Sequence, residues 1–308
     1  MSAPDPDGWI IEEGIGETRA ALIENGEIVE ARVRREGIIP AGTVLDAKLV
    51  AVAPRVTVEA DGEQFLLPRG VSGISEGSRL RIEVVRERLG GSEPWKRALA
   101  RFTEEEPRPA PPLAEGRAGK IEGWDDLLEE ARSGMIGFDG GELRIEPTAA
   151  MTMIDVDGWL QPDKLAQMAA WAAARAIRRL DIGGQVGIDF PNLEGRDARR
   201  EIGEIIDAYL SKPFERTAMN GFGFVQIVRP RERASLIELA RDRAAFEARA
   251  LLRRAEKEVG ATRLVAHPAV LGAIPEAWIE RLSRRVGGEV TLQPDATLSI
   301  SGAYAQQK

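Results

Sequence analysis

The chain has 308 residues with 43% hydrophobic and 30% charged residues, a balance typical of a folded protein of two or three domains, and its net charge of -8 argues against indiscriminate binding to nucleic acid. It contains no cysteine and one histidine, which excludes disulfide scaffolds, thiolate zinc sites and mechanisms that need two histidines. The first residues lack the features of a secretory signal and no apolar run is long enough to span a membrane, so we expect a soluble cytoplasmic protein without membrane contact.

The first predicted element is a β-hairpin over 17–35. Two apolar runs flank Asn25-Gly26, and this dipeptide between apolar runs is the strongest short-range signal for a hairpin. Residues 41–102 then form short apolar and alternating segments separated by glycines, which predicts a small closed β-barrel. Residues 103–133 begin with a Pro- and Glu-rich linker and end in a short helix.

The pattern of predicted secondary structure changes at residue 134. Strand and helix patterns alternate over 145–228, which indicates a mixed α/β core. We expect its last strand over 216–230 and one long charged helix over 233–259, before a small β-α-β unit closes the chain. The predicted segments are therefore 1–40, 41–102, 103–133, 134–236 and 237–308.

Two aspartates stand at or near the carboxyl ends of strands in this core, Asp155 after Met153-Ile154 and Asp189 after Gly187-Ile188. Open α/β sheets build their sites at that edge. If the two strands are neighbours, the carboxylates converge, and their repulsion is costly unless a cation joins them. Oxygen ligation of this kind suits Mg²⁺, which keeps several waters and takes one or two carboxylates.

Asp157 follows Asp155 by two residues, so on a continuing strand it faces the same side and could orient a water that the metal activates. A strand that ends in Asp before Gly is also ordinary turn or helix-cap chemistry, and the residues alone leave this alternative open.

Arginines after the last predicted strand are candidates for contacting phosphate. Arg229 and Arg231 alternate there, and guanidinium groups pair bidentately with phosphate oxygens. Salt bridges or solvated positions are the alternative for each of them. We expect His267, far from the aspartates in sequence, to be structural.

The stretches PTAAMTMIDVDG, AARAIRRLDIGGQVGIDF and FGFVQIVRPRERASL, in this order within 147–236, resemble the catalytic domain of the ribonuclease E/G family. The resemblance implies a mixed α/β and α+β fold, with a ribonuclease-H-like/DNase-I-like core, an inserted OB-fold barrel and a small C-terminal α/β unit. It implies that Asp155 and Asp189 hold the catalytic Mg²⁺. The family's asparagine two residues after the first aspartate is Asp157 here.

In the barrel, the resemblance implies that Phe65 stacks on an RNA base and that Lys96 contacts the RNA backbone. Core packing of Phe65 and a solvated surface charge at Lys96 are the alternatives.

Three departures make this a short form of the family. Most of the region that senses a 5′-monophosphate is missing between barrel and core. Without cysteine there is no zinc link between subunits, so any homo-oligomer would form without zinc. Gly221 stands where the family has an arginine before the last core strand.

The function we expect is a magnesium-dependent endoribonuclease that hydrolyses single-stranded RNA during RNA processing or decay. The alternative is a non-catalytic RNA-binding or assembly protein derived from such a nuclease, and a nuclease for another nucleic acid is a weaker third. Neighbouring Asp155 and Asp189 would favour the nuclease, whereas distant or buried ones would favour the binding protein.

Overall fold

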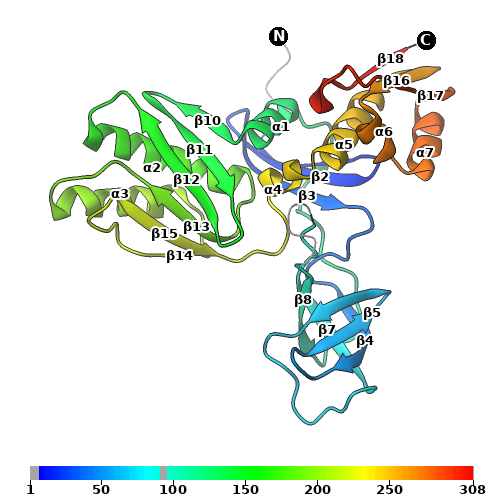
Figure 1. Ribbon diagram of the computed structural model, residues 1–308, viewed down its shortest axis with the longest axis horizontal. Helices are drawn as coiled ribbons and strands as arrows, with labels where there is room; N and C mark the ends of the chain where they lie inside the picture. Colours follow the sequence, from blue (N-terminus) through cyan, green and yellow to red (C-terminus); the bar gives the residue numbers. More distant parts are fainter. Residues whose placement is uncertain (1–6, 91–95, 308) are drawn as a thin grey trace.

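The computed structural model describes residues 7–90 and 96–307; the parts of the predicted segments at 1–6, 91–95 and 308 lie outside the described residues. The described chain forms a mixed α/β structure with a four-stranded, a six-stranded and a three-stranded sheet and one closed barrel. Figure 1 shows the barrel projecting below the N-terminal sheet, with the six-stranded sheet to one side and the C-terminal unit to the other.

The N-terminal sheet has the strand order β3-β2-β1-β9. Its strands are β1 (Gly8–Glu13), β2 (Glu17–Glu24), β3 (Glu27–Arg35) and β9 (Arg117–Ala118). The predicted hairpin is confirmed, because β2 and β3 pair through Glu24 and Glu27. Asn25 and Gly26 between them have φ values of 53° and 77°, the left-handed conformation that a tight hairpin turn requires.

The barrel is closed in the order β4-β5-β6-β8-β7. Its strands are β4 (Val44–Ala51), β5 (Thr57–Ala60), β6 (Glu63–Leu66), β7 (Arg79–Arg86) and β8 (Ala98–Thr103). The alternating residues Leu80, Ile82 and Val84 of β7 point into its core, as a half-buried strand requires. The prediction of a small closed barrel is therefore confirmed.

The predicted linker packs against the rest of the chain in spite of its irregular backbone. Leu113 and Ala114 are buried beside Ala20 of β2. Arg32 and Arg34 of β3 donate hydrogen bonds to the carbonyl oxygens of Leu113 and Pro111, at 2.9 and 2.8 Å. The segment therefore fastens the barrel to the N-terminal sheet. The short helix predicted after it is α1 (Trp124–Ser133).

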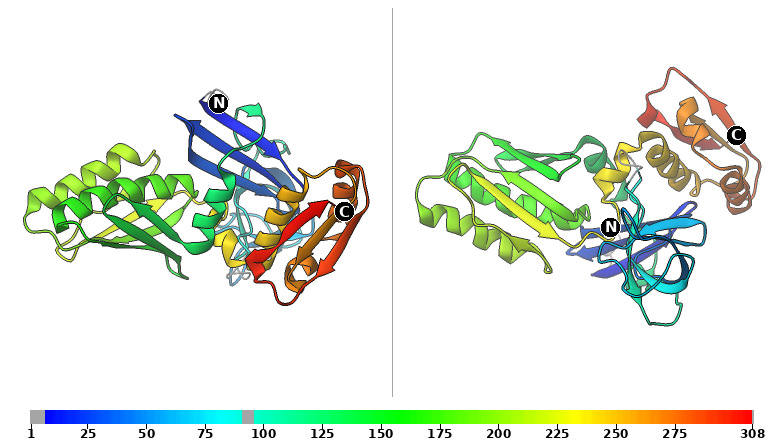
Figure 2. Two further views of the ribbon diagram at one scale, coloured as in Figure 1. Left: turned by 90° about the horizontal axis from the view of Figure 1, so that it is seen from above. Right: turned by 60° about the horizontal axis from the view of Figure 1, so that its bottom comes forward.

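The six-stranded sheet has the order β10-β11-β12-β13-β15-β14. Its elements are β10 (Met135–Phe138), β11 (Gly141–Pro147), β12 (Thr152–Gly158), α2 (Pro162–Arg179), β13 (Gly184–Asp189), α3 (Arg196–Tyr209), β14 (Glu215–Arg216) and β15 (Phe224–Arg229). Figure 2 shows both helices on one side of this sheet. The side chains facing them are buried, among them Leu143, Ile145, Ile154, Val186, Ile188, Val225 and Ile227. The other face of the sheet is open, and the charged residues of the strands lie on it.

Two sequence predictions near this sheet are wrong. The expected strand over 216–230 is two strands, β14 and β15, because the Asn220 carboxamide oxygen accepts hydrogen bonds from the backbone N–H groups of Phe222 and Phe224 and holds a turn between them. The expected helix over 233–259 is also interrupted.

The interruption lies at Asp242, between α4 (Leu236–Arg241) and α5 (Arg243–Ala255). Asp242 has φ −85° and ψ 74°, outside the helical region, and its side chain accepts a hydrogen bond from the N–H of Ala245. A capping aspartate therefore starts a new helix inside the charged run. In the sequence, Asp242 is one of many charged residues over 233–259, so its capping role does not stand out.

The C-terminal unit is built on a three-stranded sheet. Its elements are β16 (Thr262–Ala266), α6 (Pro268–Gly272), α7 (Glu276–Val286), β17 (Val290–Pro294) and β18 (Tyr304–Gln307). β16 and β17 are parallel, as the predicted β-α-β unit requires. Across 7–90 and 96–307, no helix has the length and apolar character needed to cross a membrane.

A buried carboxylate lies where the barrel joins the core. Glu87 follows β7, and its N–H donates to the carbonyl oxygen of Glu232 at 2.7 Å. Its side chain is 3% exposed. Burial raises the pKa of the Glu87 carboxyl to about 7, although nearby arginines (Arg34, Arg35 and Arg233) oppose the shift.

This raised pKa predicts a pH-dependent stability. Because the folded pKa exceeds the unfolded value of 4.5, the stabilising contribution is complete below about pH 4.5 and is lost as the pH rises through 7. Glu87→Gln stays neutral, so its stability relative to wild type should increase by on the order of 3 kcal/mol between pH 4.5 and 8. Urea unfolding at both pH values measures this, with the exposed Glu59→Gln as control. A constant difference between wild type and Glu87→Gln would contradict it.

Candidate active site on the open face of the six-stranded sheet

Asp155 and Asp189 lie side by side on neighbouring strands. β12 and β13 are parallel, and Asp155 pairs in register with Asp189. Residues paired in this way share one face of the sheet, with strands about 4.8 Å apart. Both side chains are exposed on the face opposite α2 and α3. The strands are thus neighbours, which is the arrangement that favours the nuclease over the binding protein.

The row of residues through this pair crosses the sheet. On one side, Arg144 of β11 pairs in register with Asp155, and on the other, Phe224 of β15 pairs with Asp189. Arg144 is half exposed, and its guanidinium lies 3.3 Å from a carboxylate oxygen of Glu142. An exposed cation therefore lies one strand away from Asp155 and two strands away from Asp189, and no sequence motif marks it.

Asp157 extends the acidic face toward the end of β12. It is exposed and two residues beyond Asp155, so it lies on the same face of the strand. In the part of the chain that the structure describes, no three His, Cys, Asp or Glu side chains gather as a metal site. A pair of aspartates with open solvent beside it fits Mg²⁺, which keeps most of its waters, and does not fit a closed zinc site.

On the open face, apolar side chains cover the part of β13 that leads up to Asp189. A Cβ atom on Gly187 would lie 2.5 Å from the ring of Phe224 and within 3.0 Å of the sulfur atoms of Met151 and Met153. Only glycine leaves room for these three side chains above β13. The carboxylates therefore border an apolar shelf on the open face.

Two exposed aromatic residues stand at the same edge of the sheet. Trp159, which directly follows β12, is 80% exposed, and Phe222, in the turn before β15, is 83% exposed. The carboxyl ends of β12 and β13 meet at this edge, because the strands are parallel and β15 begins opposite Asp189. Both rings are therefore open to solvent at the end of the sheet where the two aspartate-bearing strands end. Their positions immediately beside the aspartate-bearing strands were the signal that sequence reasoning missed.

The comparison with known proteins concerns this same sheet. Residues 125–232 match the Ribonuclease E/G family, and both in-register aspartates fall within the match. Residues 125–232, the family region, are thus similar to the ribonuclease E/G family over about a third of the chain. It runs from α1 to the end of the six-stranded sheet, whereas the N-terminal sheet, the barrel and the C-terminal unit lie outside the match.

Curated ribonuclease G sequences are similar to a stretch of comparable length. Ribonuclease G of Escherichia coli (strain K12), of Shigella flexneri and of Salmonella typhimurium (strain SL1344) are each 34% identical over 109 residues. The alignment covers 32% of this chain and 22% of each relative. The chain thus spans about a fifth of the length of the curated relatives that it matches.

The structure corrects the predicted role of Phe65. Its side chain is fully buried in the barrel core, on β6 between Val58 of β5 and Ala98 of β8. An RNA base cannot reach a ring that is 0% exposed. The prediction that Phe65 stacks on RNA, which came from the family resemblance, is wrong in this structure.

Lys96 lies at the junction of the barrel and the family region. Its ammonium group is 3.5 Å from the carbonyl oxygen of Ala149, in the loop that leads into β12. The barrel therefore comes close to the Asp155 strand at this point. A contact between Lys96 and an RNA backbone stays a prediction.

Arg229 and Arg231 do not lie near the aspartates. Arg229 pairs in register with Gly184, at the opposite end of β13 from Asp189. Its guanidinium donates to the carbonyl oxygen of Ile182 at 3.0 Å, and burial lowers its pKa. Arg231 is paired with Glu238 of α4. Both side chains brace the fold, so the prediction that they contact phosphate at this site is wrong.

Proposed function

We propose that this protein is a magnesium-dependent endoribonuclease that hydrolyses phosphodiester bonds of single-stranded RNA in RNA processing or decay. The observation that carries the proposal is the in-register pair Asp155–Asp189 on an open sheet face inside the family region. A protein that only bound RNA would have no need to keep two like charges next to each other. The non-catalytic alternative is therefore not favoured.

Each residue of the site has a separate role in the proposed reaction. Asp155 and Asp189 would hold Mg²⁺ through one carboxylate each. When bound, this ion supplies positive charge for a phosphoryl oxygen and makes water a stronger nucleophile. Asp157 would accept a hydrogen bond from water on the same face and orient it. Arg144 would pair with a phosphate oxygen beside Asp155, because its guanidinium is exposed in the same row.

The finer assignment of the fold belongs to the same proposal. We assign the closed barrel as an OB-fold, the N-terminal sheet as part of a ribonuclease-H-like subdomain and the six-stranded sheet as DNase-I-like. The contact between Lys96 and Ala149 supports a barrel that guides the RNA strand toward β12. The proposal includes a cytoplasmic location, and it permits a homo-oligomer that forms without a zinc link, because the chain has no cysteine.

The test is incubation of the purified chain with a labelled single-stranded RNA, in Mg²⁺ and in a chelator. We expect internal cuts with Mg²⁺ and none with the chelator. A duplex RNA and a single-stranded DNA of the same sequence are the matched controls, and both should remain uncut. Saturable RNA binding without cleavage would overturn the proposal in favour of the binding protein. Equal cleavage of the DNA would overturn its substrate class.

A further inference from the structure

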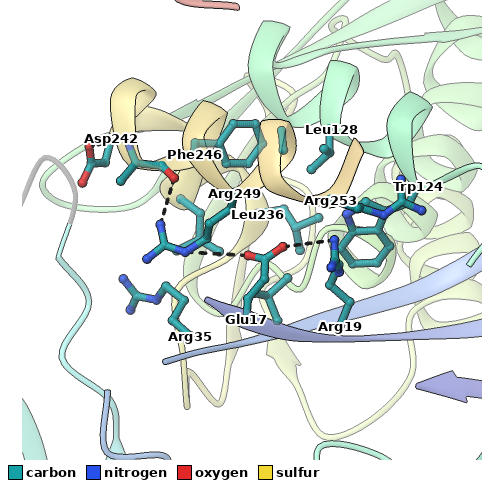
Figure 3. A pocket seen from close by; sticks show the side chains of 14 residues that line it. Glu17, Arg19, Arg35, Trp124, Leu128, Leu236, Asp242, Phe246, Arg249 and Arg253 are labelled. Atoms are coloured by element: carbon teal, nitrogen blue, oxygen red, sulfur yellow. Dashed lines mark hydrogen bonds and ion pairs between the residues drawn. The ribbon is translucent and has the colours of Figure 1, made fainter. Parts of the chain in front are cut away.

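A cavity of about 70 Å³ lies between the N-terminal sheet and the helices α1, α4 and α5 (Figure 3). Its charged lining comes from β2, β3, α5 and the capping residue before α5, and it comprises Arg19, Arg35, Arg249, Arg253, Glu17 and Asp242. Apolar side chains, among them Leu128, Leu236 and Phe246, form the remaining wall. None of these residues lies on the six-stranded sheet, so the cavity is separate from the candidate active site.

Arg19 is the most unusual residue of this cavity. Its side chain is 1% exposed, yet its Nε and Nη1 have no hydrogen-bond partner among the described residues. The nearest carboxylates, of Glu17, Glu12 and Glu256, are 3.7, 3.9 and 4.0 Å away, which is too far for hydrogen bonds. Leaving a buried charged donor unsatisfied is costly, so the site calls for an acceptor that the described residues do not supply.

Three further buried donor atoms of the lining also lack a hydrogen-bond partner. Nε1 of Trp124 and the Nε atoms of Arg249 and Arg253 have no hydrogen-bond partner within 7–90 and 96–307. No carboxylate oxygen of the described lining is in the same state. The unmet hydrogen-bonding capacity of the cavity is therefore all of the donor kind, and it fits a ligand with several acceptor oxygens.

The charged groups around the cavity nearly balance, so its unpaired donor atoms, rather than a net positive charge, select the ligand. Four guanidinium groups face the cavity together with the carboxylates of Glu17 and Asp242, while Glu12, Glu256 and Asp125 pair with Arg19 or Arg253 from outside the lining. The volume of about 70 Å³ has room for a few waters or for one tetrahedral oxyanion. Asp242 is exposed and Arg35 partly exposed, so the cavity reaches solvent on their side.

We propose that this cavity binds a tetrahedral oxyanion of the phosphate class, with Arg19, Arg249 and Trp124 as donors. The bound anion would satisfy the buried donors and hold the N-terminal sheet against the helices. The proposal is independent of RNA cleavage, and its failure would leave the proposed nuclease untouched.

Calorimetric titration of the full chain with inorganic phosphate, in a chloride buffer, tests this inference. We expect saturable binding of one phosphate and a rise of Tm with phosphate concentration. Arg249→Gln should weaken the affinity at least tenfold. Arg243→Gln removes the same charge from an exposed position of the same helix, and it should leave the affinity unchanged.

The direction in which a second substitution changes the phosphate affinity distinguishes an anion site from a network of ion pairs. Glu17→Gln removes a negative charge from the lining, so it should tighten phosphate binding. Competition by AMP would show that a phosphate group on a larger molecule also enters, whereas its absence would restrict the ligand to the free ion. Folded wild type without saturable binding, equal weakening by Arg243→Gln and Arg249→Gln, or weaker binding by Glu17→Gln would each overturn the proposal, and the cavity would then hold water only.

Discussion

Replacing Asp155 or Asp189 by Asn is expected to lower magnesium-dependent RNA cleavage by about two to four orders of magnitude. Each substitution removes one negative charge from a pair that sits in register on β12 and β13. Both side chains are exposed and the new ones are nearly isosteric, so the fold should not change. Single-turnover cleavage of a labelled single-stranded RNA measures the loss, and calorimetry with Mg²⁺ should show weakened binding of the ion in the same variants.

Two matched variants sharpen this experiment. Asp163→Asn removes an exposed carboxylate in the first turn of α2, and it should cleave like wild type. Asp157→Asn restores the residue that the family resemblance places there, so we expect it to retain cleavage. If Asp155→Asn and Asp189→Asn cleaved as well as Asp163→Asn, the assignment of the active site would be refuted.

Replacing Trp159 or Phe222 by Ala is expected to raise KM for single-stranded RNA by about 5- to 150-fold with little change in kcat. Stacking of one base on an aromatic ring is worth about 1–3 kcal/mol, and each ring is at least 80% exposed beside the aspartate pair. The affinity, rather than the chemistry, should suffer because neither ring contributes charge to the reacting phosphate. Filter binding and steady-state cleavage separate the two quantities.

The control for this prediction is an aromatic residue on the other layer of the domain. Tyr209 at the end of α3 is 50% exposed, and its ring packs edge-on against Trp171. Tyr209→Ala should leave KM unchanged, and Trp159→Phe should preserve most of the affinity because it retains a stacking ring. A loss in Tyr209→Ala equal to that in Trp159→Ala would argue against an RNA platform at this edge.

Local chemistry explains which elements could be predicted. Asn25-Gly26 specifies its hairpin within four residues, and the alternation of Leu80, Ile82 and Val84 reports directly on one buried face of a strand. The elements that sequence reasoning misjudged depend on single side-chain contacts. Asn220 divides the expected strand, and Asp242 divides the expected helix, each through a hydrogen bond to a backbone N–H a few residues on.

The residue types along the chain already indicate the chemistry of the site. The chain has no cysteine, its one histidine lies far from the aspartates in sequence, and Asp155 and Asp189 stand at or near strand ends, so the sequence favours oxygen ligands. The sequence does not show that β12 and β13 are neighbours with Asp155 opposite Asp189. It also does not show that Trp159 and Phe222 lie exposed at the same end of the sheet. The fold also buries Phe65 in the barrel core and pairs Arg229 and Arg231 with other groups of the protein. The physical reason is that the direction of a side chain follows from which surfaces the fold covers, and those surfaces come from segments far apart in the sequence.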